Sequence, residues 1–479
     1  MRARLFAEEN RKWWTLAAVA FGLFMIMLDN TVVNVALPSM QRSLHLKISE
    51  LEWVVTGYAL TFGALMLTGG KLADLLGRRL VFVVGLAVFT LASLFCGLAW
   101  SPGVLIGARV VQGVGAAMMN PATLSIITVT FPPRQRGTAI GIWVGVSALA
   151  LAIGPLVGGL ITERVNWNWV FFINVPIGVI AIAAAFLFIR ESRDESREQH
   201  PDLWGQVTAG LGLFALIYAL IESNNYGWGS LRIVLAFVVA AVSLVAFALL
   251  ERHQRLPMID LSLFRNATFA GANTVMLLTA LAMFGVFFYV SLYMQQVNGW
   301  SPIQAGAAFL PMTLLITVVA PQAGKFADRI GSRPLVAVGL TLVAGSLVIY
   351  SRLGTHTTFW NLLPAMLLGG LGMPMTMTPT TAAAMSSVAR DKAGVGSAVL
   401  NSARQVGGSI GIALMGAIVA SGTTAALHAG DNRRVAFVHG LHNGLLVAAV
   451  IAFCGALVGF ATIRKHQHAE PAAELAEAA

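Results

Sequence analysis

Long apolar runs separated by short polar segments are the dominant pattern of this chain. Each run holds roughly 20 residues, the length of helix that crosses a bilayer. About fourteen such runs can be distinguished, at residues 13–37, 51–69, 80–100, 103–128, 138–161, 169–189, 203–222, 231–250, 268–297, 303–322, 334–352, 360–385, 396–421 and 437–463. The pattern predicts an all-α membrane protein with about fourteen transmembrane helices.

A charged loop occurs twice, each time after the second apolar run of a half. Residues 70–79 read GKLADLLGRR and residues 324–333 read GKFADRIGSR. Such a repeat predicts two pseudo-symmetric six-helix bundles, with two extra helices between them, as in transporters. The expected boundaries are 1–189 for the N-terminal bundle, 190–202 for a cytoplasmic linker without a catalytic role, 203–260 for the extra helices, 261–465 for the C-terminal bundle and 466–479 for a polar cytoplasmic tail.

Charge is scarce and unevenly distributed. Only 11% of the residues are charged and 57% are hydrophobic, and the net charge is +10. Most Lys and Arg residues fall in alternate loops and both tails, so the excess follows the positive-inside rule and does not indicate a nucleic-acid partner. This distribution predicts cytoplasmic termini. The two cysteines lie in apolar runs without metal-ligand spacing, and no Gly-x-x-x-x-Gly-Lys-Ser/Thr loop for ATP is present.

One acidic residue, Asp29, lies deep in an apolar run, whereas almost all others fall in loops, tails or helix ends. A carboxylate in hydrocarbon is costly, so an intramembrane acid is a candidate functional group. At 1.5 Å per residue, Asp29 lies about 13 Å from Pro38 and Arg109 about 10 Å from Pro102, the expected outer ends of their helices. We expect the two side chains to pair and to act as a proton switch, and a static buried ion pair is the alternative.

The repeated loop has two interpretations. A solvated hairpin with positive charges on the cytoplasmic side explains its Lys and Arg residues, but not the acids Asp74 and Asp328 at the same offset. We expect the acid either to cap a helix start or to pair with Arg136, and so to latch a cytoplasmic gate. The residues assigned to this gate are Gly70, Asp74, Gly77, Arg78, Arg79, Arg136, Asp328 and Arg333.

Small residues recur in the fifth apolar run, as Gly141-x-x-x-Gly145 and as Gly154-Pro155-x-x-Gly158-Gly159. Small residues four apart let helices approach closely, and a Gly-Pro pair permits a kink. The spacing alone leaves a moving hinge and plain close packing equally open.

Together these motifs resemble those of the major facilitator superfamily, specifically its fourteen-helix drug:proton antiporters. The similar segments extend over essentially the whole chain and include LDNTVVNVALP at 28–38, the loop at 69–79, RVVQGVG at 109–115 and GPLVGG at 154–159. The resemblance implies proton coupling by Asp29 and Arg109 and a cytoplasmic gate at Asp74 and Arg78. It also implies export rather than uptake, through an antiporter motif at Gly145, Gly154, Pro155, Gly158 and Gly159.

The chain departs from the family pattern in two respects. Position 75 is Leu where the family loop usually has a basic residue, although Arg329 keeps that charge in the second copy. Several multidrug relatives carry extra acids in their second-half helices, and this chain has none there. Export of polyvalent cations is therefore not expected.

The substrate route is expected between the two bundles, near the middle of the membrane. Methionine and aromatic side chains suit promiscuous apolar ligands. The candidate residues are Met25, Asn34, Met118, Asn120, Tyr289, Tyr293, Gln296, Met373, Met377 and Asn401. For each residue taken singly, a place in the packing or against lipid is the alternative.

The leading hypothesis is a proton-coupled antiporter that exports hydrophobic or monocationic drugs, antiseptics or dyes by alternating access. A dedicated exporter of one metabolite or antibiotic is the second hypothesis, and a non-transporting membrane sensor is the third. We expect no enzymatic activity, no cofactor other than protons as the coupling ion, and no metal site. The expected partners are a small-molecule substrate and the lipid bilayer, without nucleic acid, for a monomer in the bacterial cell (inner) membrane.

Overall fold

The computed structural model describes residues 8–193, 202–254, 257, 259–389 and 392–464. The predicted tail, 466–479, and residues 194–201 of the predicted linker lie outside this part. The elements are α2 (Glu8–Leu44), α3 (Ile48–Leu76), α4 (Arg78–Gly97), α5 (Pro102–Thr130), α6 (Pro133–Arg164), α7 (Trp169–Phe172), α8 (Asn174–Phe188), α9 (Leu203–Tyr226), α10 (Leu231–His253), η1 (Leu261–Arg265), α11 (Ala267–Leu292), η2 (Tyr293–Val297), α12 (Pro302–Ala308), α13 (Leu310–Ile330), α14 (Ser332–Tyr350), α15 (Phe359–Ser386), α16 (Ala393–His428) and α17 (Arg433–Thr462). The regular structure of the described residues is therefore entirely helical.

Thirteen helices of the described chain are long and apolar enough to cross a membrane, counting α7 with α8, α11 with η2, and α12 with α13. The 28-residue helix α15 is not among them, because it is less apolar, with Pro364, Pro374 and Pro379 inside it. It nevertheless packs beside α13 and α14. Adding α15 to the thirteen gives fourteen, so the predicted fold class is confirmed.

The first helix is longer than its apolar run. The prediction that it ends near Pro38 is wrong, because α2 continues through this proline to Leu44. A proline removes one backbone donor but does not by itself end a membrane helix when neighbouring helices support it. The helix instead ends just before His45, whose φ of +53° is left-handed.

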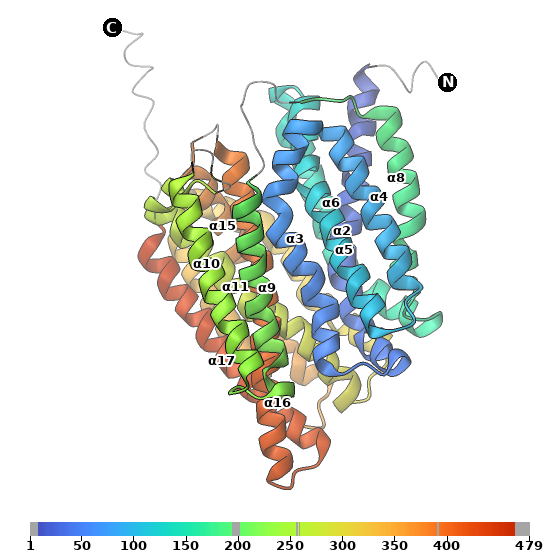
Figure 1. Ribbon diagram of the computed structural model, residues 1–479, viewed down its shortest axis with the longest axis vertical. Coiled ribbons are helices and arrows are strands. Elements are labelled where there is room, and N and C mark those ends of the chain that lie inside the picture. Colours follow the sequence, from blue (N-terminus) through green and yellow to red (C-terminus); the bar gives the residue numbers. More distant parts are fainter. Residues whose placement is uncertain (1–7, 194–201, 255–256, 258, 390–391, 465–479) are drawn as a thin grey trace.

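The helices form two groups that stand side by side (Figure 1). In Figure 1, α2–α8 lie on the right, and α11–α17 lie on the left and behind. Helix α3 packs against α16, and α6 packs against α12 and α13, so the groups meet along two seams. Helix α9 contacts both α3 and α16, and α10 packs on α9. We call α2–α8 the N-bundle and α11–α17 the C-bundle.

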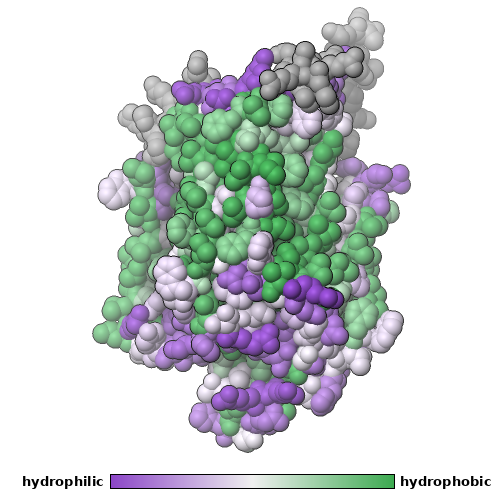
Figure 2. Space-filling model, turned by 90° about the vertical axis from the view of Figure 1, so that its right-hand side faces the viewer, coloured by the Kyte–Doolittle hydropathy of each residue, from purple (hydrophilic) through white to green (hydrophobic). Residues whose placement is uncertain are grey.

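The surface has a wide hydrophobic band between two hydrophilic ends, as Figure 2 shows for one side of the molecule. Such a band is what a bilayer core requires of a protein that spans it. Helix α2 begins and α17 ends at the same end of the molecule, at the top of Figure 1. We call this end the terminal face and the other end the opposite face. The hairpin of α16 and α17 projects beyond its neighbours at the opposite face.

Candidate functional site: a buried ion pair beside a seam between two bundles

The structure brings Asp29 of α2 and Arg109 of α5 into direct contact inside the N-bundle. Nη1 of Arg109 lies 2.5 Å from Oδ2 of Asp29, and the two side chains are 1% and 0% exposed. Gln112 completes a triangle, since its Oε1 accepts from Arg109 at 2.7 Å and its Nε2 donates to Oδ1 of Asp29 at 3.1 Å. Charge-assisted bonds of this kind are the strong ones in proteins, so this polar centre holds α2 to α5.

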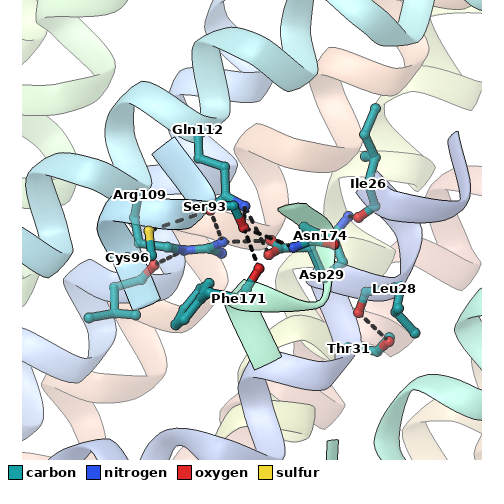
Figure 3. A network of polar contacts seen from close by, with 12 residues as sticks. Ile26, Leu28, Asp29, Thr31, Ser93, Cys96, Arg109, Gln112, Phe171 and Asn174 are labelled. Atoms are coloured by element: carbon teal, nitrogen blue, oxygen red, sulfur yellow. Dashed lines mark hydrogen bonds and ion pairs between the residues drawn. The ribbon is translucent and has the colours of Figure 1, made fainter. Parts of the chain in front are cut away.

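Further contacts surround the network of Asp29, Arg109 and Gln112, which Figure 3 shows together with Ser93 and Asn174. Nε of Arg109 donates to the backbone carbonyl of Val54 in α3 at 2.9 Å, and the guanidinium carbon lies 4.2 Å from the ring centroid of Tyr58. Ser93 of α4 accepts from Gln112 at 3.2 Å and from Asn174 of α8 at 3.0 Å. The network therefore joins five helices of one bundle.

The sequence analysis missed the polar residues around the pair. Gln112 follows Arg109 by three positions, a spacing that places both side chains on one face of a helix. This spacing could have identified Gln112 from the sequence. Ser93 and Asn174 stand in separate apolar runs, where a single hydroxyl or amide is equally consistent with a bond to its own helix backbone.

The repeated loop forms a tight junction between consecutive helices in both bundles. Gly77 separates α3 from α4 with a φ of +121°, and Gly331 separates α13 from α14 with a φ of +91°. Glycine adopts this region without the penalty that a Cβ imposes. The two glycines at matching offsets therefore serve the same backbone turn.

Neither expected role of Asp74 is seen. Asp74 lies inside the last turn of α3, and its Oδ1 pairs with Arg78 across the glycine junction at 3.0 Å. Arg136 instead donates to the backbone carbonyl of Phe131 at 3.0 Å. Asp74 and Arg78 are four positions apart on a nearly continuous helical path, a spacing that brings opposite charges within reach. Asp74 can therefore pair with Arg78 without any contact to α6. In the second copy Arg333 lies 4.0 Å over the ring centroid of Phe460.

Glu191, in the part of the predicted linker that is described, has a structural role that the sequence analysis did not assign. Its carboxylate accepts from the backbone amides of Arg79 at 3.0 Å and Leu80 at 3.1 Å, and it lies 3.9 Å from the Arg79 side chain. These amides open α4, where an anion is favoured by unpaired N–H groups and by the helix dipole. Glu191 thus caps α4 from a distant segment.

Replacing Glu191 by Ala should remove this cap and lower the stability of the purified protein by about 1 kcal/mol. Thermal unfolding in detergent would measure the loss. Glu191→Gln keeps an oxygen acceptor but removes the charge, so it should lose less. Equal melting temperatures for all three proteins would show that the cap contributes nothing.

An ion pair also joins two segments at the terminal face of the C-bundle. Lys392, directly before α16, donates to Oδ2 of Asp260 at 2.6 Å. This hydrogen bond, with those from Ser262, lowers the pKa of Asp260 to about 2. The pair therefore contributes stability above the ordinary carboxyl pKa of about 3.9, and this is lost as the pH falls through about 2. Because both side chains are partly exposed, the contribution is small, about 0–1 kcal/mol.

The glycines of α6 divide into two groups by their surroundings. A Cβ on Gly158 would lie 2.7 Å from the backbone oxygen of Val32 in α2, and one on Gly159 would lie 2.4 Å from that of Pro302 in α12. A Cβ on Gly154 would collide with the Thr31 side chain. A Cβ on Gly145, nearer the terminal face, would meet nothing within 4 Å. The glycines at 154–159 therefore permit close packing of α6 against α2 and α12, whereas Gly145 has no such neighbour.

Hydrogen bonds join the two bundles near the opposite face. The donors are Tyr289, Ser291, Gln295, Gln296, Ile303 and Thr313 of the C-bundle, and their acceptors are Glu52, Asn34, Val35, Gln41, Glu163 and Ala152 of the N-bundle. In α6 the residues from 150 to 159 are largely buried, whereas most from 136 to 149 are exposed or half-buried. The bundles are therefore pressed together at the opposite face.

The candidate substrate residues do not share one environment. Asn34, Met118, Asn120, Met377 and Asn401 are half-buried, whereas Met25, Tyr289, Tyr293 and Met373 are buried. Met118 packs toward Gly85 of α4. Gln296 is exposed at the opposite face, where it donates to Gln41. In this conformation Tyr289 and Tyr293 are occupied by protein partners, because their hydroxyls bond to Glu52 and to Gly354 and Thr357.

Asp29 is not the only acid that the protein buries near an apolar run, since Glu52 and Glu251, at the ends of α3 and α10, are also buried among the described residues. Glu52 lies four residues after the start of α3 and is only 3% exposed. In the sequence, Glu52 stands at the start of an apolar run, which begins at residue 51. The C-bundle covers this end of α3, which the sequence of α3 alone does not reveal.

No group of three or more His, Cys, Asp or Glu residues in the described part of the chain could hold a metal ion. Cys96 is buried and donates to Oε1 of Gln112 at 3.7 Å, and Cys454 is an exposed free thiol.

Comparisons with known proteins agree on one family. The sequence profile of the Major Facilitator Superfamily matches residues 19–412. The chain is 38% identical over 449 residues to the puromycin resistance protein of Streptomyces alboniger, covering 93% of this chain and 89% of that protein. It is 38% identical over 419 residues to the tetracenomycin C resistance and export protein of Streptomyces glaucescens, covering 86% and 77%.

The chain is also similar to a mycobacterial protein in sequence and to a solved transporter in structure. The chain is 35% identical over 416 residues to the multidrug resistance protein Stp of Mycobacterium tuberculosis, covering 86% of this chain and 77% of that protein. A bacterial homologue of the human lysosomal transporter Spinster, solved in an inward-facing, unoccupied conformation, aligns with a TM-score of 0.70 at 17% identity, covering 96% and 99%. At this identity the structural likeness shows the fold alone.

Proposed function

Because the chain belongs to the Major Facilitator Superfamily, we propose that it is a proton-coupled antiporter that exports hydrophobic or monocationic drugs, antiseptics or dyes. The observation that carries this proposal is the buried centre of Asp29, Arg109 and Gln112. A charge pair inside a membrane bundle is expensive to build and is by default a functional group. Relatives named for resistance and export of antibiotics support the export direction.

Proton coupling follows from what a proton on Asp29 would change. The ionised carboxylate attracts Arg109, which is also held by the Val54 carbonyl of α3. Protonation removes the negative charge and leaves the guanidinium with neutral acceptors only, which weakens the link between α2 and α5. The proton thereby alters how helices of the N-bundle are held together, and that change can bias alternating access.

The driving force is sufficient for export. One elementary charge moving through 100 mV releases about 2.3 kcal/mol, and each tenfold step of accumulation costs about 1.4 kcal/mol. One proton per substrate, with one net charge moved, thus sustains a gradient of roughly fiftyfold per 100 mV. One proton carried by Asp29 would supply this stoichiometry.

The proposed setting is a bacterial inner membrane with the terminal face in the cytoplasm, as the positive-inside rule indicates. The hairpin of Gly70, Asp74, Gly77 and Arg78 would then be part of a cytoplasmic gate, and the closed seam would face outside. The protein would work as a monomer, without enzymatic activity or a cofactor. The domain boundaries given by the sequence stay part of this proposal.

Substrate would pass between the bundles. The half-buried residues Asn34, Asn120, Met377 and Asn401 would contact it, and the buried tyrosines would do so only after the seam opens. A dedicated exporter of one antibiotic is the second candidate, because the puromycin and tetracenomycin C relatives are each named for a single compound. A panel of such compounds tested for competition with the dye would separate the two.

The test is flux in proteoliposomes that hold the purified protein, with an imposed pH gradient and a fluorescent cationic dye. Gradient-driven dye movement is expected for the wild type and should vanish in Asp29→Asn, because the amide cannot carry the proton. Asp431→Asn is the matched control, since Asp431 lies in the loop between α16 and α17 and pairs, within the described residues, with the exposed His439. Full gradient-driven movement in Asp29→Asn would refute the assignment of the proton to this residue.

A further inference from the structure

Glu52 is a membrane-buried carboxyl group that the Asp29 centre does not use. It lies on α3 about 6 Å along the axis from the first residue of the helix, on the side of the seam that faces the C-bundle. Its exposed fraction is 3%. Tyr289 of α11, which is fully buried, donates its hydroxyl proton to Oε1 of Glu52. The carboxyl group therefore links the two bundles directly.

The backbone of α16 closes the site from another direction. A Cβ built on Gly416 would lie 2.3 Å from Oε1 of Glu52 and 2.7 Å from Oε2. Only a glycine permits α16 to lie this close to the carboxyl group. Contributions from α3, α11 and α16 thus enclose Glu52, and two of these three helices belong to the C-bundle.

The charged and titratable groups around Glu52 provide no cation for it. On α9, Glu222 is a second carboxylate, held by Trp53 Nε1 at 3.3 Å and by Asn225 at 2.8 Å. On α5, Arg109 is committed to Asp29 and to the Val54 carbonyl. On α11 the titratable group is Tyr289, and residues 409–423 of α16 include none. In the described part of the chain Glu52 forms no ion pair.

An ionised Glu52 would therefore be a charge with one hydrogen bond, a like charge nearby and almost no exposure to solvent. Burial of an unpaired carboxylate is far more costly than burial of the neutral acid. The neutral acid still accepts from Tyr289 through one oxygen. Opening of the seam would separate α3 from α11 and α16 and bring water to the group, which removes the reason for it to hold a proton.

We propose that Glu52 is a second proton-binding site, occupied while the bundles are closed at the opposite face and emptied when they part. The proposal deepens the proposed function, since it assigns a proton to the closing movement of the exporter, but it does not depend on which substrate is carried. By linkage, the ratio of closed to open molecules should fall about tenfold per pH unit. This slope applies at pH values where Glu52 is ionised in the open form and still protonated in the closed form. An acidic outside would thus favour closure at the opposite face.

The test measures the separation of the two bundles at the opposite face and does not depend on transport. One spin label is placed at Ser43→Cys, in the last turn of α2, and one at Arg352→Cys, directly after α14; both positions are exposed and belong to different bundles. Exposed Cys454 is replaced by Ser, whereas Cys96 is buried and stays. The distance distribution between the labels is then recorded by pulsed electron resonance as the pH is raised.

With the natural Glu52, a population with a longer distance should grow as the pH rises, with the tenfold slope given above. Glu52→Gln should keep the short distance at every pH, because an amide cannot ionise. The matched control is Glu50→Gln, on the same helix, where the side chain accepts from the exposed backbone amide of Lys47 and glutamine can do the same. It should follow the natural protein. An unchanged pH profile in Glu52→Gln would overturn the proposal.

Two further variants separate this proposal from its neighbours. Tyr289→Phe removes the donor and should increase the open fraction at each pH while it keeps the slope, and a lost slope would assign the titration to the tyrosine and overturn the proposal. Asp29→Asn should keep the Glu52-dependent slope even though it abolishes coupled flux. Failure of gradient-driven flux in the wild type with the slope intact would refute the proposed function alone.

Discussion

Arg109→Leu should destabilise the protein by about 3–5 kcal/mol, the effect expected when one partner of a buried ion pair is removed. The loss has a definite origin. Asp29 would be left as an unpaired charge that is almost inaccessible to solvent, with Gln112 as its remaining donor, and the Val54 carbonyl would lose its bond from Nε. Thermal unfolding in detergent, together with the amount of protein that reaches the membrane, would measure the effect.

Two further variants identify the cause of the stability loss in Arg109→Leu. The double variant Asp29→Asn with Arg109→Leu should recover most of the lost stability, because the stranded charge is gone. Arg109→Lys keeps the charge but not the planar guanidinium that reaches Asp29, Gln112 and Val54 at once, so it should remain well below the natural protein. A double variant as unstable as the single one would mean that packing, and not the stranded carboxylate, accounts for the loss.

Among substitutions of a glycine by alanine in α6, Gly159→Ala should weaken the closed seam most. Its Cβ would lie 2.4 Å from the backbone oxygen of Pro302, and backbone atoms of α12 cannot rotate away as a side chain can. Overpacking of this kind costs about 1–3 kcal/mol, so the ratio of closed to open molecules should fall by roughly fivefold to a hundredfold. The spin-label pair described above would report a larger long-distance population at every pH.

Gly145→Ala is the matched control for this prediction. It places the same methyl group on the same helix where nothing lies within 4 Å. Alanine favours a helix over glycine by about 1 kcal/mol, so both variants gain equally from intrinsic propensity and only the contact with α12 differs. Identical distance distributions for the two variants would show that the approach of α6 to α12 does not hold the seam closed.

The sequence located the ion pair because depth in a helix follows from a fixed rise per residue. Asp29 and Arg109 could be counted to a similar level without knowledge of the packing, even though one of the reference points was wrong: α2 passes through Pro38. The fourteen crossings were accessible for the same reason, since membrane helices must be both long and apolar.

Glu52 could not be found in this way, since its burial is a property of the other bundle. At the start of an apolar run, a glutamate that faces water and one covered by α11 and α16 look alike in sequence. Tyr289 shows the converse: an aromatic residue in a central helix suits a substrate pocket, yet its hydroxyl is bonded to Glu52 in this conformation. Contacts between distant segments decide both cases.

The repeated hairpin shows a third kind of limit. Gly77 and Gly331 recur at the same offset because a positive φ is a local requirement that glycine satisfies. The partner of Asp74 depended instead on a choice between Arg78, one turn along the chain, and Arg136 on α6, and sequence does not rank these. The structure has the nearer one.

The position of α9 has a consequence for how the bundles can move. It hydrogen-bonds to α3 through Gln206 and Ala64 and to α16 through Asn224 and Ala417, so it straddles one seam. At the other seam α6 and α12 meet directly. An additional helix therefore bridges one seam, whereas the other is held, within the described residues, by direct contacts of α6 with α12 and α13. The bundles should accordingly rotate relative to each other about an axis close to α9. The widest lateral gap, and the easiest exchange with lipid, would then lie at the edge formed by α6 and α13.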